Sequence, residues 1–548
     1  MKPSLLVLAC WILILLQPCC AKPLQARNVA DDTQTPQAEP AILSSIIINR
    51  SNIFDEDAAA AWLLVNRLHS ITRESVIRRE IWLQPGDPIT SADAQELERN
   101  LRQLDLFARV RVTLVDSDSQ PGSASLVIDT TDRLSIVASA GGSFLGGIGE
   151  VSFSIGENNL LGLGHRLQFG YSENTEGELL GSIAYDNVLI GSNDIYAGIG
   201  AGQTEEGEFA TATFTNRFLN FNDHRFWKIE LEQKTSRDDY FDSGESIAEV
   251  PRFDQEVKLQ WQHRRGQPVR LLRIGPVLNW QQTQYEAPVG AQAQTIEQPE
   301  DASTLFAGAL IAIDSKVQFQ RLTGLDTLSF EQDVTLGFSA WMIAGMENRT
   351  TAISDRTLPL IALGGTTSHA ISPESFFSTS IDTLASIDSD SLSRWSVSTA
   401  ATAYNTHLKN QTLAARIRYK SAFNGNSLPR QQTLGEATGL RGFPAREFNG
   451  EQSLLVNLEH RWQTPVKLAS LELGTVAFAD AGWIGDRGNS NWLDAAKTSA
   501  GVGIRIGSPQ LLGSSIIRLD LAFALGDGAD VYDPSLSLSL GQVFDFTP

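Results

Sequence analysis

The residues of this chain most able to form a specific chemical interaction are an arginine and an aspartate that lie far apart in the sequence. Arg441 stands in the glycine-flanked segment 439–443, GLRGF, and Asp480 stands in the segment 478–482, FADAG. A guanidinium offers carboxylates a rigid fork of hydrogen-bond donors, so such a pair can fix the position of a loop. An arginine on a loop and a carboxylate on a strand therefore suggest an ion pair that locks the interior of the protein.

Motifs that would indicate an enzyme are missing from the sequence. It has no Gly-x-Ser-x-Gly elbow, no His-Glu-x-x-His pair and no glycine-rich phosphate loop with a lysine. Its seven histidines show no ligand spacing, and its three cysteines, Cys10, Cys19 and Cys20, all precede residue 22. We therefore expect no enzymatic activity, no catalytic residue, no cofactor and no metal site.

The N-terminus is typical of a cleavable secretory signal over residues 1–21. Lys2 precedes an apolar run over residues 5–16, which is shorter than the roughly 20 residues of a membrane helix, and small residues precede Lys22. A lipoprotein signal with Cys19 or Cys20 acylated is the alternative. Residues 22–41, rich in Pro, Gln, Asp, Thr and Ala, predict a flexible N-terminal segment.

Residues 42–132 predict a small α+β domain with one core. The hydrophobic pattern indicates strands at 46–48, 107–115 and 125–129 and helices at 55–69, 75–82 and 91–104. Ser91 is the expected N-cap of the third helix, whose leucines at 97, 101 and 104 are spaced to face the core.

Residues 133–548 predict a β-barrel in a membrane. The chain alternates with a period of two from about residue 134, most cleanly at 257–262 and 535–540, which predicts strands with one apolar face. An exported chain without a long apolar helix can cross a membrane only as a closed barrel. We count up to eighteen candidate strands, with the Ser/Thr/Asp-rich stretch 346–393 ambiguous. The net charge of −21 argues against a nucleic-acid partner.

Several motifs in order carry a family resemblance. Residues 72–80, 86–87 and 101–110 resemble a POTRA domain, a periplasmic module that precedes certain barrels. Residues 156–164 (GENNLLGLG), 439–443, 457–459 (NLE) and 478–482 are similar to the BamA/TamA-type outer-membrane transporter superfamily, which includes the two-partner secretion transporters. The resemblance implies a barrel of about 16 antiparallel strands in the bacterial outer membrane, with the N-terminal POTRA-like domain in the periplasm.

The resemblance also implies which residues matter. The loop 424–450 would fold into the barrel, so that Arg441 meets Asp480 with Glu459 nearby, while Gly439 and Gly442 allow the tight turn before Phe443. Alternation puts Val476 and Phe478 on the same face as Asp480, so either the lumen is locally apolar there or a bulge turns the strand.

Both ends of the barrel sequence carry further signals. Residues 539–546 resemble the assembly signal of outer-membrane barrels, with Gly541, Phe544 and Phe546 in the pattern and the two aromatic residues facing lipid. The resemblance also implies that the first strand, 134–142, meets about 534–546 at a weakly paired seam. Its small residues give it little packing; they are Ala138, Ala140, Gly141 and Gly142. The seam, and a POTRA strand edge near 110–115, could each take an extended client strand.

The function implied by this resemblance is insertion or translocation of polypeptides. Its partners would be outer-membrane lipid, unfolded polypeptide clients and accessory periplasmic proteins. Two alternatives stay open. One is a two-partner secretion transporter for a dedicated exoprotein, although that group usually carries two POTRA domains. The other is a passive porin or surface antigen.

Overall fold

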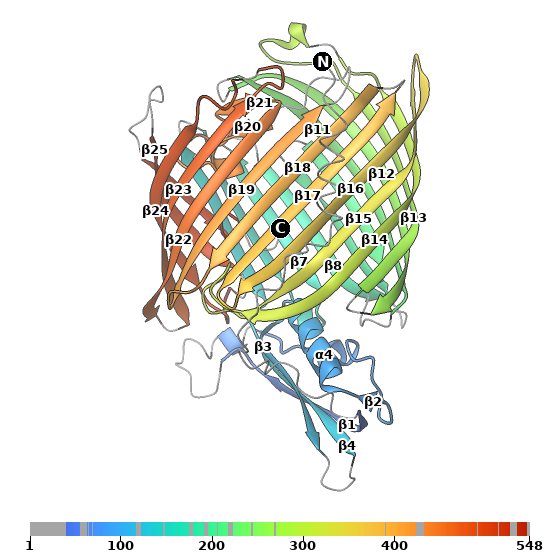
Figure 1. The fold of residues 1–548 in the computed structure, drawn as a ribbon, viewed down its shortest axis with the longest axis vertical. Coiled ribbons are helices and arrows are strands. Elements are labelled where there is room, and N and C mark those ends of the chain that lie inside the picture. The colour runs from blue at the N-terminus through green and yellow to red at the C-terminus, as the bar shows by residue number, and fades with distance from the viewer. Residues whose placement is uncertain are drawn as a thin grey trace, which may run out of the picture.

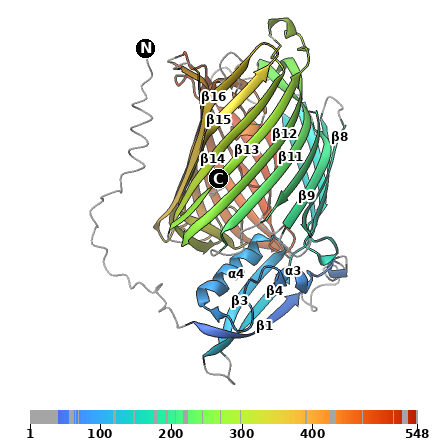
Figure 2. The same ribbon diagram turned by 90° about the vertical axis from the view of Figure 1, so that its right-hand side faces the viewer.

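The N-terminal part of the computed structural model forms a small α+β unit. The structure describes residues 40–544 except 55–62, 64, 68, 117–121, 146–147, 175–178, 191–194, 205–206, 217–222, 243–244, 268–269, 297, 389–390, 424–431, 469, 490, 513–514 and 526–533. The elements of the unit are β1 (Ala41–Ser51), α3 (Glu74–Arg78), β2 (Pro88–Ile89), α4 (Ser91–Gln103), β3 (Phe107–Asp116) and β4 (Ser123–Asp132). The sheet has the order β2-β1-β4-β3, and Figure 2 shows the unit beneath the barrel.

This POTRA-like unit confirms most of the expected elements. Leu97 and Leu101 of α4 are fully buried in its core, as their spacing predicts. The N-cap prediction was wrong by one residue, because Thr90 caps α4 in a reciprocal capping box with Asp93. The expected helix 55–69 lies largely outside the described residues.

The rest of the chain forms one closed antiparallel barrel of twenty strands in the described residues (Figure 1). The first ten are β5 (Ile136–Leu145), β6 (Ile148–Glu157), β7 (Arg166–Asn174), β8 (Leu179–Ile190), β9 (Ile195–Thr204), β10 (Gly207–Thr215), β11 (Arg225–Asp242), β12 (Glu245–Gln267), β13 (Arg270–Tyr285) and β14 (Ala302–Leu322). The others are β15 (Gln332–Thr351), β16 (Asp355–Ser372), β17 (Ser375–Asp388), β18 (Ser391–Asn405), β19 (Gln411–Phe423), β22 (Gln452–Leu468), β23 (Leu471–Gly485), β24 (Lys497–Gly507), β25 (Ile516–Leu525) and β26 (Ser535–Leu540).

The barrel fold is confirmed, but the expected count of about sixteen strands was wrong. The ambiguous stretch 346–393 lies on four consecutive strands, from the end of β15 to the start of β18. The sequences of β16 and β17 are rich in Ser, Thr and Gly, because half of their side chains face a polar lumen, and this composition weakens the apolar signal. The resemblance supplied the number sixteen, and it does not determine how many hairpins this barrel contains.

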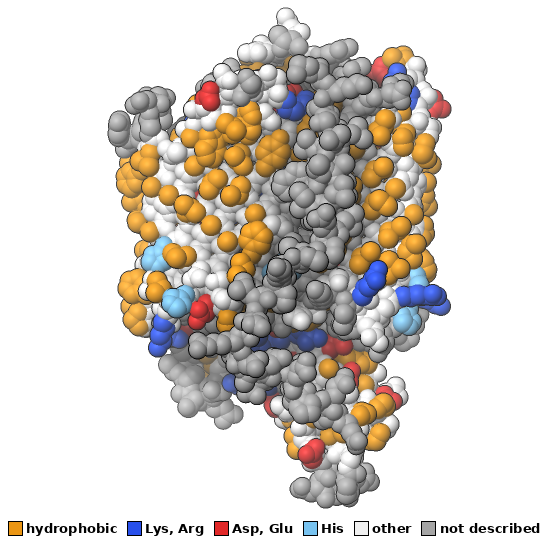
Figure 3. All heavy atoms as spheres, viewed as in Figure 1, with side chains coloured by type: hydrophobic (Ala, Val, Ile, Leu, Met, Phe, Trp, Pro, Cys, Tyr) orange, Lys and Arg blue, Asp and Glu red, His pale blue; other side chains and the backbone are white. Residues whose placement is uncertain are grey.

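Alternation along the strands separates a lipid face from a lumenal face. On β26, Leu536 and Leu538 are exposed to the outside, while Ser535 and Ser537 are buried inside. Apolar side chains cover much of the barrel wall in Figure 3, and the charged groups visible on that wall lie near its two ends. Among the described residues, no helix is long and apolar enough to cross a membrane.

The turn formed by the sequence motif 156–164 joins the barrel to the POTRA-like unit. This turn links β6 to β7 and contains the short helix η1 (Leu160–Gly162). Asn159 donates a hydrogen bond to the Thr72 hydroxyl over 2.8 Å, and the carbonyl of Gly162 accepts one from the Arg73 amide over 2.8 Å. The motif therefore holds the domain against one end of the barrel, which we call the POTRA end.

The barrel closes between β26 and β5 through a short ladder. Only residues 536–538 pair with residues 142–144, whereas β5 pairs with β6 over its whole length. The four residues predicted for this seam all lie on β5; they are Ala138, Ala140, Gly141 and Gly142. Within the described residues, the segment 136–141 of β5 has no strand on its β26 side, because the chain leaves the sheet after Leu540.

Candidate functional site in the barrel lumen

The connection between β19 and β22 folds into the lumen. Its described part begins at residue 432 and contains the small hairpin of β20 (Gln432–Leu434) and β21 (Phe448–Gly450), with the short helix η3 (Glu436–Thr438) between them. Leu440 and Phe443 are buried in an apolar cluster with Leu455 of the wall. The loop is therefore anchored by apolar packing on both sides of Arg441.

Two glycines shape the tip of this loop. Gly439 and Gly442 have φ values of +98° and +85°, which other residues rarely adopt. A Cβ atom at Gly442 would lie 3.1 Å from the backbone nitrogen of Ala524 on β25. The two glycines therefore let the backbone approach the wall closely enough for the side chain between them to reach it.

Arg441 is almost completely buried, with 1 % of its surface exposed. Its guanidinium donates two hydrogen bonds to Asp480, each 2.8 Å long, and a third to Glu459 over 2.7 Å. A further carboxylate, Asp520, lies 3.6 Å from the Arg441 Nη1 atom. Burial by itself would lower the pKa of Arg441. The hydrogen bonds from Arg441 to Asp480 and the negative charges of Asp480, Glu459 and Asp520 nevertheless raise this pKa above its ordinary value. We call Arg441, Asp480 and Glu459 the loop lock.

The third carboxylate was not predicted. Asp520 projects inward from β25, where it also accepts a hydrogen bond from Arg505 over 2.6 Å. The signal available in the sequence was the same as for Asp480, an acidic residue on the inward face of an alternating strand. No sequence motif marks it as part of the cluster.

Phe478 forms the floor beneath the guanidinium. The Arg441 Cζ atom lies 3.5 Å from the centre of the Phe478 ring, a cation–π contact. The pairing of β23 with β22 is regular from Gln452 to Gln463, so no bulge turns Phe478 or Asp480. Of the two interpretations of the alternation, the locally apolar lumen is confirmed.

Asn457 connects the loop to the lock. Its amide donates to the carbonyl of Gly439 over 2.8 Å and to Asp480 over 2.7 Å. Its oxygen accepts two hydrogen bonds from Arg416 of β19. The segment 457–459 of the resemblance therefore contributes both of its polar side chains to the site.

The C-terminal prediction was wrong for Phe544, which faces the lumen and not lipid. The strand ends at Leu540, and Gly541, with a φ value of +83°, begins a segment that enters the barrel. We call residues 541–544 the tail. Phe544 is 4 % exposed, while Phe546 lies outside the described residues.

The physical reason for this placement is a set of donors in the lumen that the tail satisfies. The carbonyl of Phe544 accepts hydrogen bonds from Arg461 over 3.0 Å and from the Tyr404 hydroxyl over 3.3 Å. The carbonyl of Val543 accepts one from Arg416 over 3.3 Å. The ring of Phe544 also lies 4.9 Å from the Arg416 guanidinium carbon and 5.1 Å from that of Arg461.

The described residues contain no group of His, Cys, Asp and Glu that could hold a metal ion. The buried carboxylates of the loop lock and Asp520 are paired with arginines instead. This arrangement can fix and release segments of chain.

A closed barrel with an inward arginine-anchored loop and a POTRA-like unit at one end defines a class of outer-membrane protein. The Omp85 superfamily domain matches residues 365–544, and a POTRA domain of the surface antigen variable number repeat type matches residues 68–133. The chain therefore carries a POTRA domain followed by an Omp85 superfamily domain. It is a barrel of the bacterial outer membrane with its POTRA domain in the periplasm, and these two domains support protein insertion or secretion as its general function.

Solved structures of similar proteins include BamA from Haemophilus ducreyi lacking POTRA domains 1–3, with a TM-score of 0.41 at 11 % identity over 91 % of this chain and 84 % of that one. CdiB from Escherichia coli has a TM-score of 0.43 at 11 % identity over 94 % and 93 %, and CdiB from Acinetobacter baumannii 0.41 at 12 % over 92 % and 74 %. These scores are too low to support a conclusion about function. No curated protein matches the sequence.

Proposed function

We propose that this protein moves polypeptides across or into the outer membrane and that the loop lock holds its resting state. The observation that carries the proposal is the burial of Arg441 among Asp480, Glu459 and Asp520. Burying four charged groups costs solvation free energy, and a loop that only covered the barrel could be held by apolar packing alone. The ion pairs of the loop lock instead hold the loop in one defined position, which is lost when one charged partner moves.

The seam supports entry of a client from the side. The backbone of residues 136–141 has an open edge in the described residues, and an open strand edge is a template for an added strand. The edge of the POTRA sheet supports this less well. The amide of Val112 on β3 is already bonded to the Glu98 carboxylate over 2.9 Å.

Crosslinking in intact cells tests this function. A photoreactive residue at Ser139 on β5 should capture unfolded outer-membrane chains, and the matched control is Leu278, a lipid-facing position on the fully paired strand β13. Capture of a single secreted protein would instead favour a two-partner secretion transporter. If neither Ser139 nor Leu278 crosslinks to a polypeptide, both transport functions would be contradicted and a passive porin would be favoured.

A further inference from the structure

The turn between β14 and β15 does not stay at the rim of the barrel. Residues 323–331, which we call the lumenal turn, connect the paired residues Leu322 and Gln332. Leu325 is 1 % exposed and packs with Phe376 and Phe544 inside the barrel. A short turn would be enough to connect these two neighbouring strands, but this periplasmic turn also carries a buried leucine into the barrel, away from its own strands.

The tip of the lumenal turn reaches strands that are not neighbours of β14 or β15. The carbonyl of Leu325 accepts a hydrogen bond from Arg461 of β22 over 2.6 Å, and Asp326 accepts one from Tyr404 of β18 over 3.0 Å. The carbonyl of Gly324 accepts one from Thr412 of β19 over 2.6 Å. In the barrel order two strands lie between β15 and β18 and four lie between β15 and β22, so these contacts reach over part of the periplasmic mouth.

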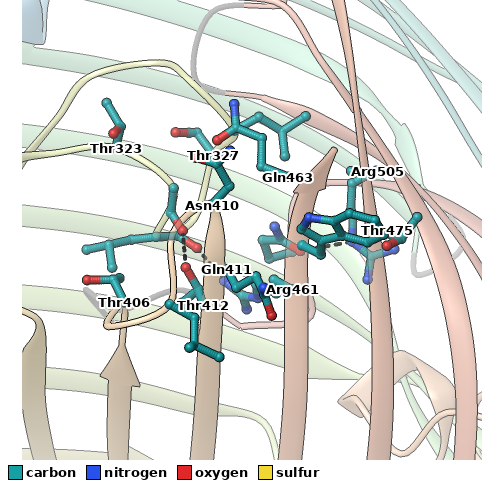
Figure 4. A pocket seen from close by; sticks show the side chains of 17 residues that line it. Thr323, Thr327, Thr406, Asn410, Gln411, Thr412, Arg461, Gln463, Thr475 and Arg505 are labelled. Atoms are coloured by element: carbon teal, nitrogen blue, oxygen red, sulfur yellow. Dashed lines mark hydrogen bonds between the residues drawn. The ribbon is translucent and has the colours of Figure 1, made fainter. Parts of the chain in front are cut away.

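The far end of this crossing is at β24. A Cβ atom built on Gly507 would lie 3.6 Å from the Leu328 Cβ atom. Between the turn and strands β22 to β24 lies a cavity of about 180 Å³, shown in Figure 4 with Arg461 and Arg505 beside it. This cavity has room for a few water molecules and is too small for a polypeptide.

The base of the lumenal turn is held by the POTRA domain. Arg102 of α4 binds Asp333 with two hydrogen bonds of 2.7 and 2.9 Å. Arg111 of β3 binds Glu331 in the same way, over 3.0 and 3.1 Å. Both pairs are bidentate, which fixes orientation as well as distance. Glu98 of α4 adds an ion pair to Arg321, at the end of β14.

A continuous set of contacts links the lumenal turn to the loop lock. Arg461, which holds the tip of the turn, donates a hydrogen bond of 2.8 Å to one oxygen of Glu459. The other oxygen of Glu459 accepts the 2.7 Å hydrogen bond from Arg441. The buried Glu459 carboxylate therefore binds both Arg461, which holds the turn on the periplasmic side, and Arg441, which anchors the loop on the outer side.

We propose that the lumenal turn is a periplasmic gate, held closed by the POTRA domain and coupled to the loop lock through Arg461 and Glu459. The proposal rests on the proposed function, because it assigns the regulation of the same lumen. When the POTRA domain moves away, Glu331 and Asp333 lose their arginine partners on that domain and the turn withdraws; Glu331 keeps the longer, 3.8 Å ion pair with Arg321. Arg461 then loses its contacts with the turn, and its hydrogen bond to Glu459 is weakened because the guanidinium is no longer fixed in place. By linkage, release of either closure weakens the other.

A disulfide that fastens the turn tests the gate. The separation of the two Cβ positions suits a bond between Leu328→Cys and Gly507→Cys, because bridged Cβ atoms lie about 3.5–4.5 Å apart. The natural cysteines, which all precede residue 22, are replaced by serine in these variants. In the full chain in planar bilayers, oxidation should lower the frequency of large openings at least about tenfold, and reductant should restore it. Leu328→Cys alone is the control and should not respond to oxidant.

Release of the POTRA contacts tests the opposite direction. Arg102→Gln with Arg111→Gln should raise the opening frequency about tenfold or more, because two charge-assisted pairs are lost. The matched control is Arg109→Gln, an exposed arginine of β3 whose side chain makes only a long, 3.5 Å hydrogen bond to Thr131 within the described part of the same domain. The gate is refuted if the oxidised pair conducts like the reduced pair, or if the double variant equals the control.

These recordings need no client, so they separate the two proposals. A response to oxidant in a protein that captures no polypeptide would retain the gate and overturn the proposed function. Client capture with unchanged conductance in all variants would retain the function and overturn the gate.

Discussion

Replacing Arg441 with alanine should release the loop, and the structure allows the size of the effect to be worked out. Glu459 keeps Arg461 and Asp520 keeps Arg505, so both remain paired. Asp480 loses both guanidinium bonds and keeps the Asn457 amide as a side-chain donor among the described residues. Leaving one partner of a buried pair uncompensated typically costs about 3–5 kcal/mol. This corresponds to a shift of roughly 10²- to 4 × 10³-fold toward the released loop.

Two measurements report the released loop. Protease cleavage within residues 432–450 and the frequency of large single-channel openings should both rise in Arg441→Ala. Arg487→Ala is the matched control, because Arg487 binds Glu451 at the base of the same loop in a bidentate but partly exposed pair, and exposed pairs contribute about 0–1 kcal/mol. Protection and conductance equal to those of the Arg487→Ala control would refute the assignment of Arg441 as the anchor. Arg441→Lys should give an intermediate result, because the charge remains and the fork is lost.

Three further predictions concern the loop tip, the tail and the POTRA contact. Gly442→Ala should also expose the loop to protease, because its positive φ and the nearby Ala524 backbone resist a Cβ atom; unchanged protection would contradict this. Phe544→Ala should lower the stability of the folded barrel in urea by about 3 kcal/mol while membrane assembly persists, whereas failed assembly would indicate that Phe544 is an insertion signal. The hydrogen bond from Arg111 holds the pKa of Glu331 below its ordinary value, so the contact is complete at neutral pH and is lost as the pH falls through that lowered value. The protection factors of the amides in residues 323–331, which correct for the slower intrinsic exchange in acid, should therefore fall once the pH drops below the ordinary pKa of glutamate, and unchanged protection factors would argue against this ion pair.

The lock could be predicted because its residue types have few other uses at such positions. An arginine between two glycines on a long loop, and single carboxylates on the polar faces of alternating strands, already suggest a pairing across the barrel. Alternation itself is a local property and survives into the structure, as Ser535 and Leu536 illustrate. Asp520 looks like Asp480 in the sequence, but the sequence does not state which inward carboxylates share one arginine.

The tail and the lumenal turn could not be predicted, because non-local contacts decide both. Residues 541–544 continue an alternating strand in the sequence, and donors on β18, β19, β22 and β24 draw them inside. Residues 323–331 have the composition of an ordinary turn. Leu325 is buried by Phe376 and Phe544, which lie far along the chain, so its burial has no local signal.

The position of Glu459 explains why the two closures would act together. A buried carboxylate is stable only while its charge is balanced, and this one divides its two oxygens between Arg441 and Arg461. If the loop withdrew Arg441, Arg461 would be left as the nearest balancing charge, and its own position depends on the carbonyls of Leu325 and Phe544. Because this one carboxylate positions both guanidinium groups, the departure of either arginine loosens the position of the other. A lumen with two independent plugs would have no reason to share a carboxylate, whereas a transporter that must stay sealed until both sides are engaged would gain from sharing one.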